Sequence, residues 1–390
     1  MDFTRKYDVV VAGAGVAGVA AALAAAELGA KTALIEKTVF FGGLGTTGLI
    51  YAYLPICDGQ GTQVSFGLAE RLLKLSVKYG PGTIPPDWDK KPHAGNPARY
   101  AVEFSPASFI IAIDEALAAA NVDCWVDTLI CGGELDGDNR LRGLWVENKS
   151  GRGLVEADCF VDATGDGEAL RRVGGAVEVG GNYLAIWAMQ HKSDLEGEGF
   201  AALLNMKYCQ AGEATQRGLS GREVSRFILD GRELLRKFYD AEHAAGKYNR
   251  DTLYPVMLPA MPQYRKIARI IGKTTLSDNQ HDTCFEDSVG MAADWRKPGP
   301  VWEMPYSTLL PEKIKGALAA GRCVSATGDA WEITRVIPTA AVTGEAAGVA
   351  AALAVAAKTT PDCIPCDEVQ KALRARGVQL HLPDVGLKYQ

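Results

Sequence analysis

A glycine-rich turn near the start of the chain could bind the phosphates of a dinucleotide. The sequence places Gly13, Gly15 and Gly18 between an apolar run and an alanine-rich segment, and Glu36 follows a second apolar run. Glycines allow a tight turn and a close approach of backbone to pyrophosphate, whose charge the N-terminus of the following helix stabilises. An acid at the position of Glu36 could accept hydrogen bonds from ribose hydroxyls. The pattern predicts dinucleotide binding, but it does not separate FAD from NAD.

Three later segments indicate an extended dinucleotide. Residues 160–166 are an apolar run ending in Ala-Thr-Gly-Asp, residues 322–329 have the same shape, and residues 343–348 open a second alanine-rich helix. FAD needs contacts at its adenine end, its ribityl chain and its ring, whereas NAD in a simple Rossmann domain rarely uses a segment so far along the chain. Each segment alone could be an ordinary strand and turn, but together and in this order they favour FAD.

In these motifs the chain resembles the FAD-dependent oxidoreductases of the glutathione-reductase and fumarate-reductase flavoprotein superfamily, and among them the branch called simply FAD-dependent oxidoreductase. The resemblance implies a flavoprotein that transfers a hydride between flavin N5 and a small organic substrate, as a dehydrogenase, reductase or oxidase. It covers the chain from end to end except for residues 180–260. The stretches that carry it are residues 36–48, 161–167, 269–272, 305–311, 321–325 and 335–348.

The resemblance also implies cofactor contacts. Glu36, with Lys37 beside it, would hold the ADP half, and Asp329 would bind the ribityl or pyrophosphate region. The N–H groups of Thr343 and Gly344 would face the pyrimidine edge of the flavin, where a helix dipole would stabilise the anionic reduced ring. The other implied contacts are Gly13, Gly15 and Gly18 at the ADP half, Gly42, Gly43 and Thr46 at the pyrophosphate and flavin edge, and Thr164 and Gly165 at the adenosine.

Two departures from the family pattern lie near the expected flavin. Many relatives carry Arg-Glu-x-Arg-Arg-Ile-x-Gly, whereas residues 265–272 read Arg-Lys-Ile-Ala-Arg-Ile-Ile-Gly. Where many relatives have a Thr-His pair, this chain has Thr327 and Gly328. Catalytic residues are therefore not transferred from relatives.

Three side chains are candidates for the chemistry: Arg335, His191 and Tyr306. Hydride transfer to a flavin needs substrate positioning, a base where an O–H or N–H is oxidised, and exclusion of water. Arg335 could orient a carboxylate or carbonyl, or it could pair with Glu332 or Glu345. His191 follows an apolar stretch that could form a sheet over the flavin, or it could be a structural histidine. Tyr306 could serve catalysis or packing.

No zinc or iron–sulfur spacing occurs in the sequence, so no metal is predicted. Cys363 and Cys366 have redox spacing but no second pair, and His281 with Cys284 lies in a polar segment that is expected to be solvated.

The elements that must position these residues predict an α/β fold, with a Rossmann-like FAD-binding domain and a discontinuous second, α+β substrate domain. Residues 7–36 read as strand, turn, helix and strand, which is a βαβ unit. The residue types change after Gly181, and Ser220 with Glu223 forms a capping box that opens a long helix. We expect residues 1–176 and 306–358 to form the FAD-binding domain, residues 177–305 the substrate or cap domain, and residues 359–390 a carboxy-terminal extension.

The composition limits the other partners. A net charge of −6 gives no reason to expect nucleic acid or an anionic membrane. Nine cysteines and a charged start without a signal peptide favour a cytoplasmic protein with reduced thiols. The apolar segments 15–28 and 340–357 are expected to be buried helices rather than membrane spans.

Three functions follow from these observations. The first is a stand-alone FAD-dependent oxidoreductase of a small-molecule substrate, acting alone or as a homo-oligomer, with an external electron acceptor where the substrate does not serve as one. The second is a flavoprotein subunit that relays electrons within a larger redox complex. The third, an NAD-only dehydrogenase, is disfavoured by the motifs near the end of the chain.

Overall fold

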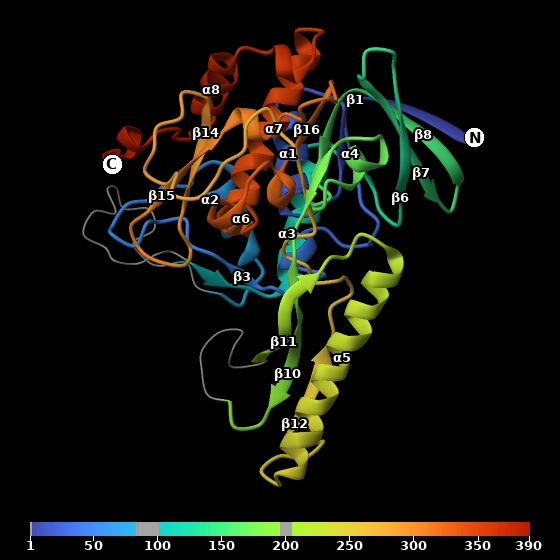
Figure 1. The fold of residues 1–390 in the computed structure, drawn as a ribbon, viewed down its shortest axis with the longest axis vertical. Coiled ribbons are helices and arrows are strands. Elements are labelled where there is room, and N and C mark those ends of the chain that lie inside the picture. Colours follow the sequence, from blue (N-terminus) through green and yellow to red (C-terminus); the bar gives the residue numbers. More distant parts are fainter. Residues whose placement is uncertain (1, 83, 85–100, 196–204) are drawn as a thin grey trace.

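The computed structural model describes residues 2–82, 84, 101–195 and 205–390. Its centre is a sheet in the order β5-β2-β1-β8-β7-β6, with β16 also paired to β8 (Figure 1). The pairs that join β5, β2, β1, β8 and β16 are parallel, whereas β7 and β6 are antiparallel. The strands are β1 (Phe3–Ala12), β2 (Thr32–Ile35), β5 (Asp123–Trp125), β6 (Leu129–Leu135), β7 (Leu141–Asn148), β8 (Gly151–Asp162) and β16 (Ala317–Ala319). A parallel sheet that begins with β1, helix α1 (Val16–Glu27) and β2 confirms the Rossmann-like α/β prediction.

Strand β8 joins the two ends of the chain. Its first half pairs with β7, from Gly151 to Glu156, and its second half pairs with β16, from Phe160 to Asp162. The sheet of the first domain is therefore completed by a strand from beyond residue 316.

Helix α7 (Ile337–Ala356) packs against α1 through small residues. A Cβ on Gly344 would lie 2.2 Å from the carbonyl oxygen of Ala17, and one on Gly348 would lie 2.2 Å from that of Ala21. Only glycine lets the two backbones come this close. By length and composition α7 could cross a membrane, but 78% of its apolar window is buried inside the fold. This confirms the expectation of a buried core helix.

A small antiparallel sheet and one long helix project from the first domain (Figure 1). The sheet has the order β11-β10-β12, and helix α5 packs on one of its faces. The capping box of Ser220 and Glu223 is present at the start of α5. These elements are β10 (Asn182–Lys192), β11 (Asn205–Gln216), α5 (Gly221–Ala244) and β12 (Leu253–Met257). They enclose a core of their own, which includes Ile186, Leu235 and Tyr239, and we call them the cap.

Residues 177–305, which we expected to form one substrate or cap domain, pack in two different places. The hairpin of β14 (Ser288–Ala293) and β15 (Val301–Pro305) is wholly buried, and Val289, Ala292 and Trp302 share one core with α1 and α7. β13 (Ala268–Ile270) pairs with β9 (Val177–Val179) beside the first domain. Among the residues that the structure describes, only β10, β11, α5 and β12 with their connections stand apart as the cap. The remaining elements are α2 (Leu68–Ser76), α3 (Pro106–Ala119), α4 (Glu168–Arg172), α6 (Gly328–Thr334), α8 (Cys366–Ala375), β3 (Ala52–Tyr53) and β4 (Val102–Glu103).

Candidate functional site

A cleft lies at the carboxyl ends of the parallel strands, and the space within its outline, open solvent included, is about 860 Å³. The turns that follow β1, β2, β8 and β16 all line it, as do the first turns of α1 and α7. Ligands of open α/β folds bind at this edge, where the strand order reverses between neighbouring connections. Segments at both ends of the sequence therefore meet at one site.

The glycine turn after β1 leaves backbone accessible to a ligand. Gly15 caps α1, and a Cβ there would meet nothing within 4 Å, so the backbone borders open space. Gly18 has another role, because its Cβ would lie 1.8 Å from the Gly13 carbonyl oxygen. Gly43, at φ +55°, passes so close to Gly15 that a Cβ would lie 2.9 Å from the Gly15 Cα. The turn can therefore hold a pyrophosphate against the N-terminus of α1.

Glu36 holds its carboxylate in place with backbone donors. It directly follows β2, is buried and lines the cleft. Its Oε2 accepts the Ala14 N–H at 2.8 Å and its Oε1 accepts the Thr38 N–H at 2.9 Å. Each carboxylate oxygen keeps a second lone pair, which fits the expected contact with ribose hydroxyls. Lys37 also lines the cleft and its side chain is exposed.

The turn after β8 forms the next wall. Thr164 and Gly165 line the cleft, and the Thr164 hydroxyl donates to Asp162 Oδ1 at 2.7 Å. Burial raises the pKa of Asp162, although hydrogen bonds from Leu170 and Thr164 oppose the rise. Arg322 reaches this wall from the turn after β16 and pairs with Asp166 at 2.8 Å. The sequence prediction missed Arg322, although it directly follows Gly321 in the recognised motif.

Asp329 and Thr46 are among the predicted cofactor contacts that do not line the cleft. Asp329 is in the first turn of α6, its side chain is 59% exposed, and it pairs with Arg296 at 2.7 Å. The Ala-Thr-Gly-Asp segment of residues 326–329 starts a helix here rather than ending a strand, and Asp329 does not line the cleft, so its ribityl contact stays a prediction. Thr46 is buried and donates its hydroxyl to the Phe41 carbonyl at 2.5 Å. Its hydroxyl stabilises the turn that carries Gly42 and Gly43, both of which line the cleft.

The N-terminus of α7 also differs from the prediction. The helix begins at Ile337, with Pro338 in its first turn, and Ile337 and Ala340 line the cleft. Thr343 lies one turn further along, where its hydroxyl donates to the Thr339 carbonyl at 2.9 Å and accepts the Gly321 N–H at 3.0 Å. Gly344 faces α1. The free N–H groups of a helix are those of its first turn, so Thr343 and Gly344 do not supply them. Pro338 was the signal for the true start.

Of the three catalytic candidates, Arg335 lines the cleft. Its Nε donates to Glu332 Oε2 at 2.6 Å, and the guanidinium lies 5.6 Å from the centre of the Trp295 ring. Arg335 thus pairs with Glu332 and lines the cleft at the same time.

His191 and Tyr306 are not part of the cleft lining. His191 lies on β10, and its ring packs on that of Tyr254, with the ring centres 5.0 Å apart. Tyr306 is buried and donates its hydroxyl to the Pro361 carbonyl at 2.8 Å. Burial raises the pKa of Tyr306. Both side chains contact other partners instead, so catalytic roles for them stay predictions that the geometry of the cleft does not support.

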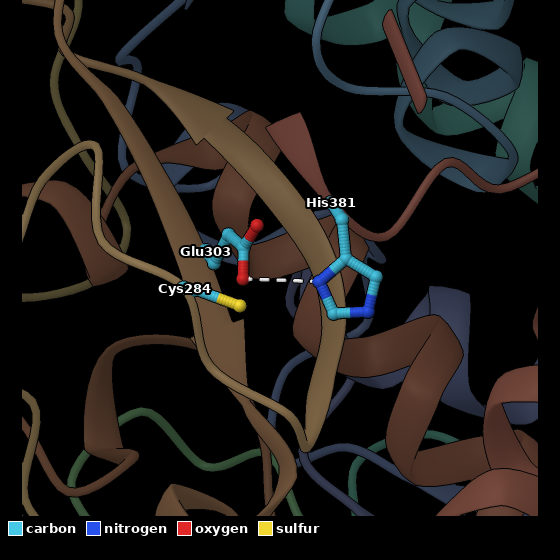
Figure 2. Close-up of side chains that lie close together, drawn as sticks. All are labelled: Cys284, Glu303 and His381. Atoms are coloured by element: carbon cyan, nitrogen blue, oxygen red, sulfur yellow. Dashed lines mark hydrogen bonds and ion pairs between the residues drawn. The ribbon is translucent and has the colours of Figure 1, made fainter. Parts of the chain in front are cut away.

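A group of potential metal ligands lies away from the cleft, at Cys284, Glu303 and His381 (Figure 2). Their ligand atoms lie within 4.8 Å of one another. The buried Glu303 carboxylate already accepts the N–H groups of Phe285 at 2.9 Å and Leu382 at 3.1 Å. It also accepts the Tyr389 hydroxyl at 2.8 Å and lies 3.2 Å from His381 Nδ1. These bonds hold the end of the chain against β15 and account for the cluster without an ion. His281 is paired with Asp282 at 2.7 Å.

Comparison with known proteins gives one family. The model of the family described as FAD dependent oxidoreductase matches residues 8–185 and 182–373. Digeranylgeranylglycerophospholipid reductase of Picrophilus torridus is 34% identical over 171 residues, which are 41% of this chain and 39% of that protein. The match thus spans about two fifths of that relative.

Solved structures are similar to the chain at low identity. A geranylgeranyl bacteriochlorophyll reductase-like protein of Thermoplasma acidophilum aligns with 98% of this chain and 86% of its own, at 17% identity and a TM-score of 0.48. BexE, studied for oxidation during BE-7585A biosynthesis, aligns with 97% of this chain and 66% of its own, at 14% identity and a TM-score of 0.50.

Proposed function

Because the chain belongs to the FAD-dependent oxidoreductase family, we propose that it transfers a hydride between the N5 atom of bound FAD and a small organic substrate. When bound, FAD supplies the site that accepts or releases the electron pair. The cleft carries this proposal: its walls come from the turns after four parallel strands and from the first turns of two helices. A ligand as long as FAD needs such separated contacts.

The residues present fit the cofactor. We propose that the turn of Gly13 and Gly15 and the N-terminus of α1 hold the pyrophosphate, and that Glu36 accepts hydrogen bonds from the ribose. The first turn of α7, at Ile337, supplies the positive helix end at the far wall. Thr164 and Gly165 border the adenosine side.

Arg335 is the residue we propose to orient the substrate. Its pair with Glu332 fixes the guanidinium at the cleft wall and leaves further N–H groups for a carbonyl or carboxylate oxygen. Met261 and Pro262, from the segment that returns from the cap, also line the cleft. We propose that the protein works in the cytoplasm on a small molecule, without nucleic acid or a membrane. The sequence has no second glycine motif after a strand, so electrons that do not come from the substrate come from an external carrier.

Anaerobic flavin reduction tests the proposal. Purified protein is reconstituted with FAD and mixed with alcohols, amines, hydroxy acids and sugars in a stopped-flow instrument, and oxygen is then added. We expect one class to bleach the flavin and an Arg335→Ala variant to slow bleaching about ten-fold or more, the usual effect of losing a charged hydrogen bond. Protein that takes up no FAD would refute the function, and unchanged bleaching by the variant would remove Arg335 from it.

One observation favours a second candidate, an electron-transfer subunit of a larger complex. Strand β12 exposes apolar side chains, with Tyr254 at 39%, Val256 at 46% and Met257 at 49% exposure. An apolar strip of this kind is typical of protein contact surfaces. A subunit would show no turnover with small-molecule electron acceptors on its own, whereas a stand-alone enzyme would.

A further inference from the structure

We propose that Arg265 binds a carboxylate of the substrate, where the cap meets the cleft. This inference rests on the proposed function, because it names the substrate class of the same site. Arg265 belongs to the segment that leads from the cap back to the first domain. Met261 and Ile267, on either side of it in the sequence, both line the cleft.

The backbone of Arg265 is fixed by one side chain at the base of the cap. Asn182 Oδ1 accepts the N–H groups of Arg265 and of Lys266, each at 2.7 Å. Asn182 Nδ2 donates to the Lys266 carbonyl at 2.7 Å. Such a bridge holds the residue in one position before any ligand arrives, which reduces the entropy lost on binding.

The Arg265 guanidinium lies over the ring of Trp187. Its central carbon is 5.7 Å from the centre of the Trp187 ring. The Trp187 ring packs in turn on Tyr208, with ring centres 4.4 Å apart. A guanidinium held over an aromatic face keeps the N–H groups at its edge directed outward, where they can meet a planar carboxylate.

The surrounding charges leave Arg265 without an acid. Glu332 serves both Lys266, at 2.6 Å, and Arg335. Asp166 serves Arg322 at 2.8 Å. Among the residues that the structure describes, no carboxylate lies within 4.0 Å of the Arg265 guanidinium, whose one hydrogen bond is to the Gln263 carbonyl at 3.3 Å. Glu332 and Asp166 thus pair with three cations, and Arg265, the fourth, pairs with neither.

The burial of the Arg265 guanidinium is a second reason to expect an anionic ligand. Burial lowers the pKa of Arg265 to about 9, and repulsion by Arg335 and Arg322 adds to the effect. The group is still charged at neutral pH. A desolvated guanidinium with several unused N–H groups is stabilised by an anion, and two parallel N–H···O bonds to a carboxylate satisfy it best.

The substrate, rather than the cofactor, is the source of this anion. The phosphates of a dinucleotide have their own donors at the N-terminus of α1, on the turn of Gly13 and Gly15. Arg265 instead comes from the cap side, next to Arg335, which we propose to orient the substrate. A carboxylate held by Arg265 would lie beside the group that Arg335 orients.

Calorimetric titration of the FAD-loaded protein with benzoate, and separately with inorganic phosphate, tests the inference. We expect benzoate to bind and to perturb the flavin spectrum, and phosphate to bind much more weakly. Arg265→Met should weaken benzoate binding about ten- to a hundred-fold, as loss of a charged hydrogen bond does. Arg265→Lys, which keeps the charge but not the paired donors, should fall between. Arg226→Met is the matched control, since Arg226 is an exposed cap arginine paired with Asp230.

The outcomes separate this inference from the proposed function. Benzoate binding that survives in Arg265→Met would overturn the inference, and so would a variant that loses FAD affinity while its benzoate affinity is unchanged. Flavin reduction by neutral substrates in a protein that binds no benzoate would also overturn it while supporting the function. Calorimetry of the FAD-loaded protein detects benzoate binding whether or not the flavin can be reduced. Arg265-dependent binding in a protein whose flavin no substrate reduces would therefore support the inference alone. If Arg265→Met fails to fold, Arg265→Lys carries the comparison.

Discussion

Replacement of Gly344 by alanine tests whether the close contact of α1 and α7 builds the cofactor cleft. The new Cβ would lie 2.2 Å from the Ala17 carbonyl oxygen, and ordinary contact begins at 3.4 Å, so the helices must separate by the difference, 1.2 Å. Both partners are helix backbone in a buried core and cannot turn aside. Overpacking of this kind costs about 1–3 kcal/mol, and we expect the upper end for Gly344→Ala.

The same displacement should weaken cofactor binding. Ala17 itself lines the cleft, and so does Ile337 at the start of α7. A shift of 1.2 Å between these helices would lengthen hydrogen bonds to a ligand held by both, since such bonds weaken beyond about 3.2 Å. We expect Gly344→Ala to lose FAD affinity about ten-fold or more. Gly348→Ala, one turn deeper, should cost similar stability but less affinity.

Urea unfolding and fluorescence titration with FAD measure the two effects. The double variant should lose less stability than the sum of the singles, because one helix movement relieves both contacts. Gly221→Ala is the control: it lies at the start of α5, and its Cβ would meet nothing within 4 Å. We expect it to stay within about 0.5 kcal/mol of the parent. Parent-like stability and FAD affinity in Gly344→Ala would refute the reasoning.

Three further predictions follow from buried carboxylates. Glu36→Ala should weaken FAD binding about ten- to a hundred-fold by removing a charged acceptor; equal affinity in a fluorescence titration would exclude the ribose contact. Glu303→Gln should lower the free energy of unfolding by about 1–3 kcal/mol, because an amide cannot accept hydrogen bonds from all of the donors that meet this carboxylate. Amide hydrogen exchange should become faster at residues 382–390, and an unchanged rate there would contradict the role of Glu303 in holding the end of the chain. Arg376→Met leaves Glu345, 2% exposed, without its cation and should cost about 3–5 kcal/mol at pH 8. Burial already raises the pKa of Glu345, so a protonated Glu345 favours the folded state at low pH and this benefit is lost as the pH rises through the raised pKa. The deficit of Arg376→Met should therefore shrink at pH 5, and a deficit independent of pH would contradict the assignment.

The parts of the site that the sequence predicted well have local signals. The turn at Gly13 and Gly15 and the acid Glu36 lie within one βαβ unit, so spacing alone places them together. The parts that it missed depend on long-range pairing. Residues 326–329 look like the end of a strand, but the strand is β16, at Ala317–Ala319, and its register against β8 is set by a segment far back in the chain.

Packing between elements that are distant in the sequence could not be predicted either. Nothing local in β14 and β15 indicates that they pack on α7 rather than in the cap, because a wholly buried hairpin reads the same in either domain. Arg265 illustrates the same limit. Lys266 and Arg269 follow it closely, so the sequence is compatible with either a solvated basic face or a ligand anion. Only the fold shows the Trp187 ring beside Arg265 and the acid partners of its neighbours.

The shared edge of β8 also dictates an order of assembly during translation. Chain synthesis proceeds from the amino terminus, so β1, β2, β7 and β8 leave the ribosome long before β16 and α7 exist. Until then half of one edge of β8 and the apolar face of α1 lack their partners, and such surfaces are prone to aggregate. The cap has its own core and can therefore fold before β16 and α7 are synthesised. A nascent chain released before α7 is complete would therefore carry a folded cap on an open sheet, and its cofactor cleft would lack the walls that the turn after β16 and the first turn of α7 supply.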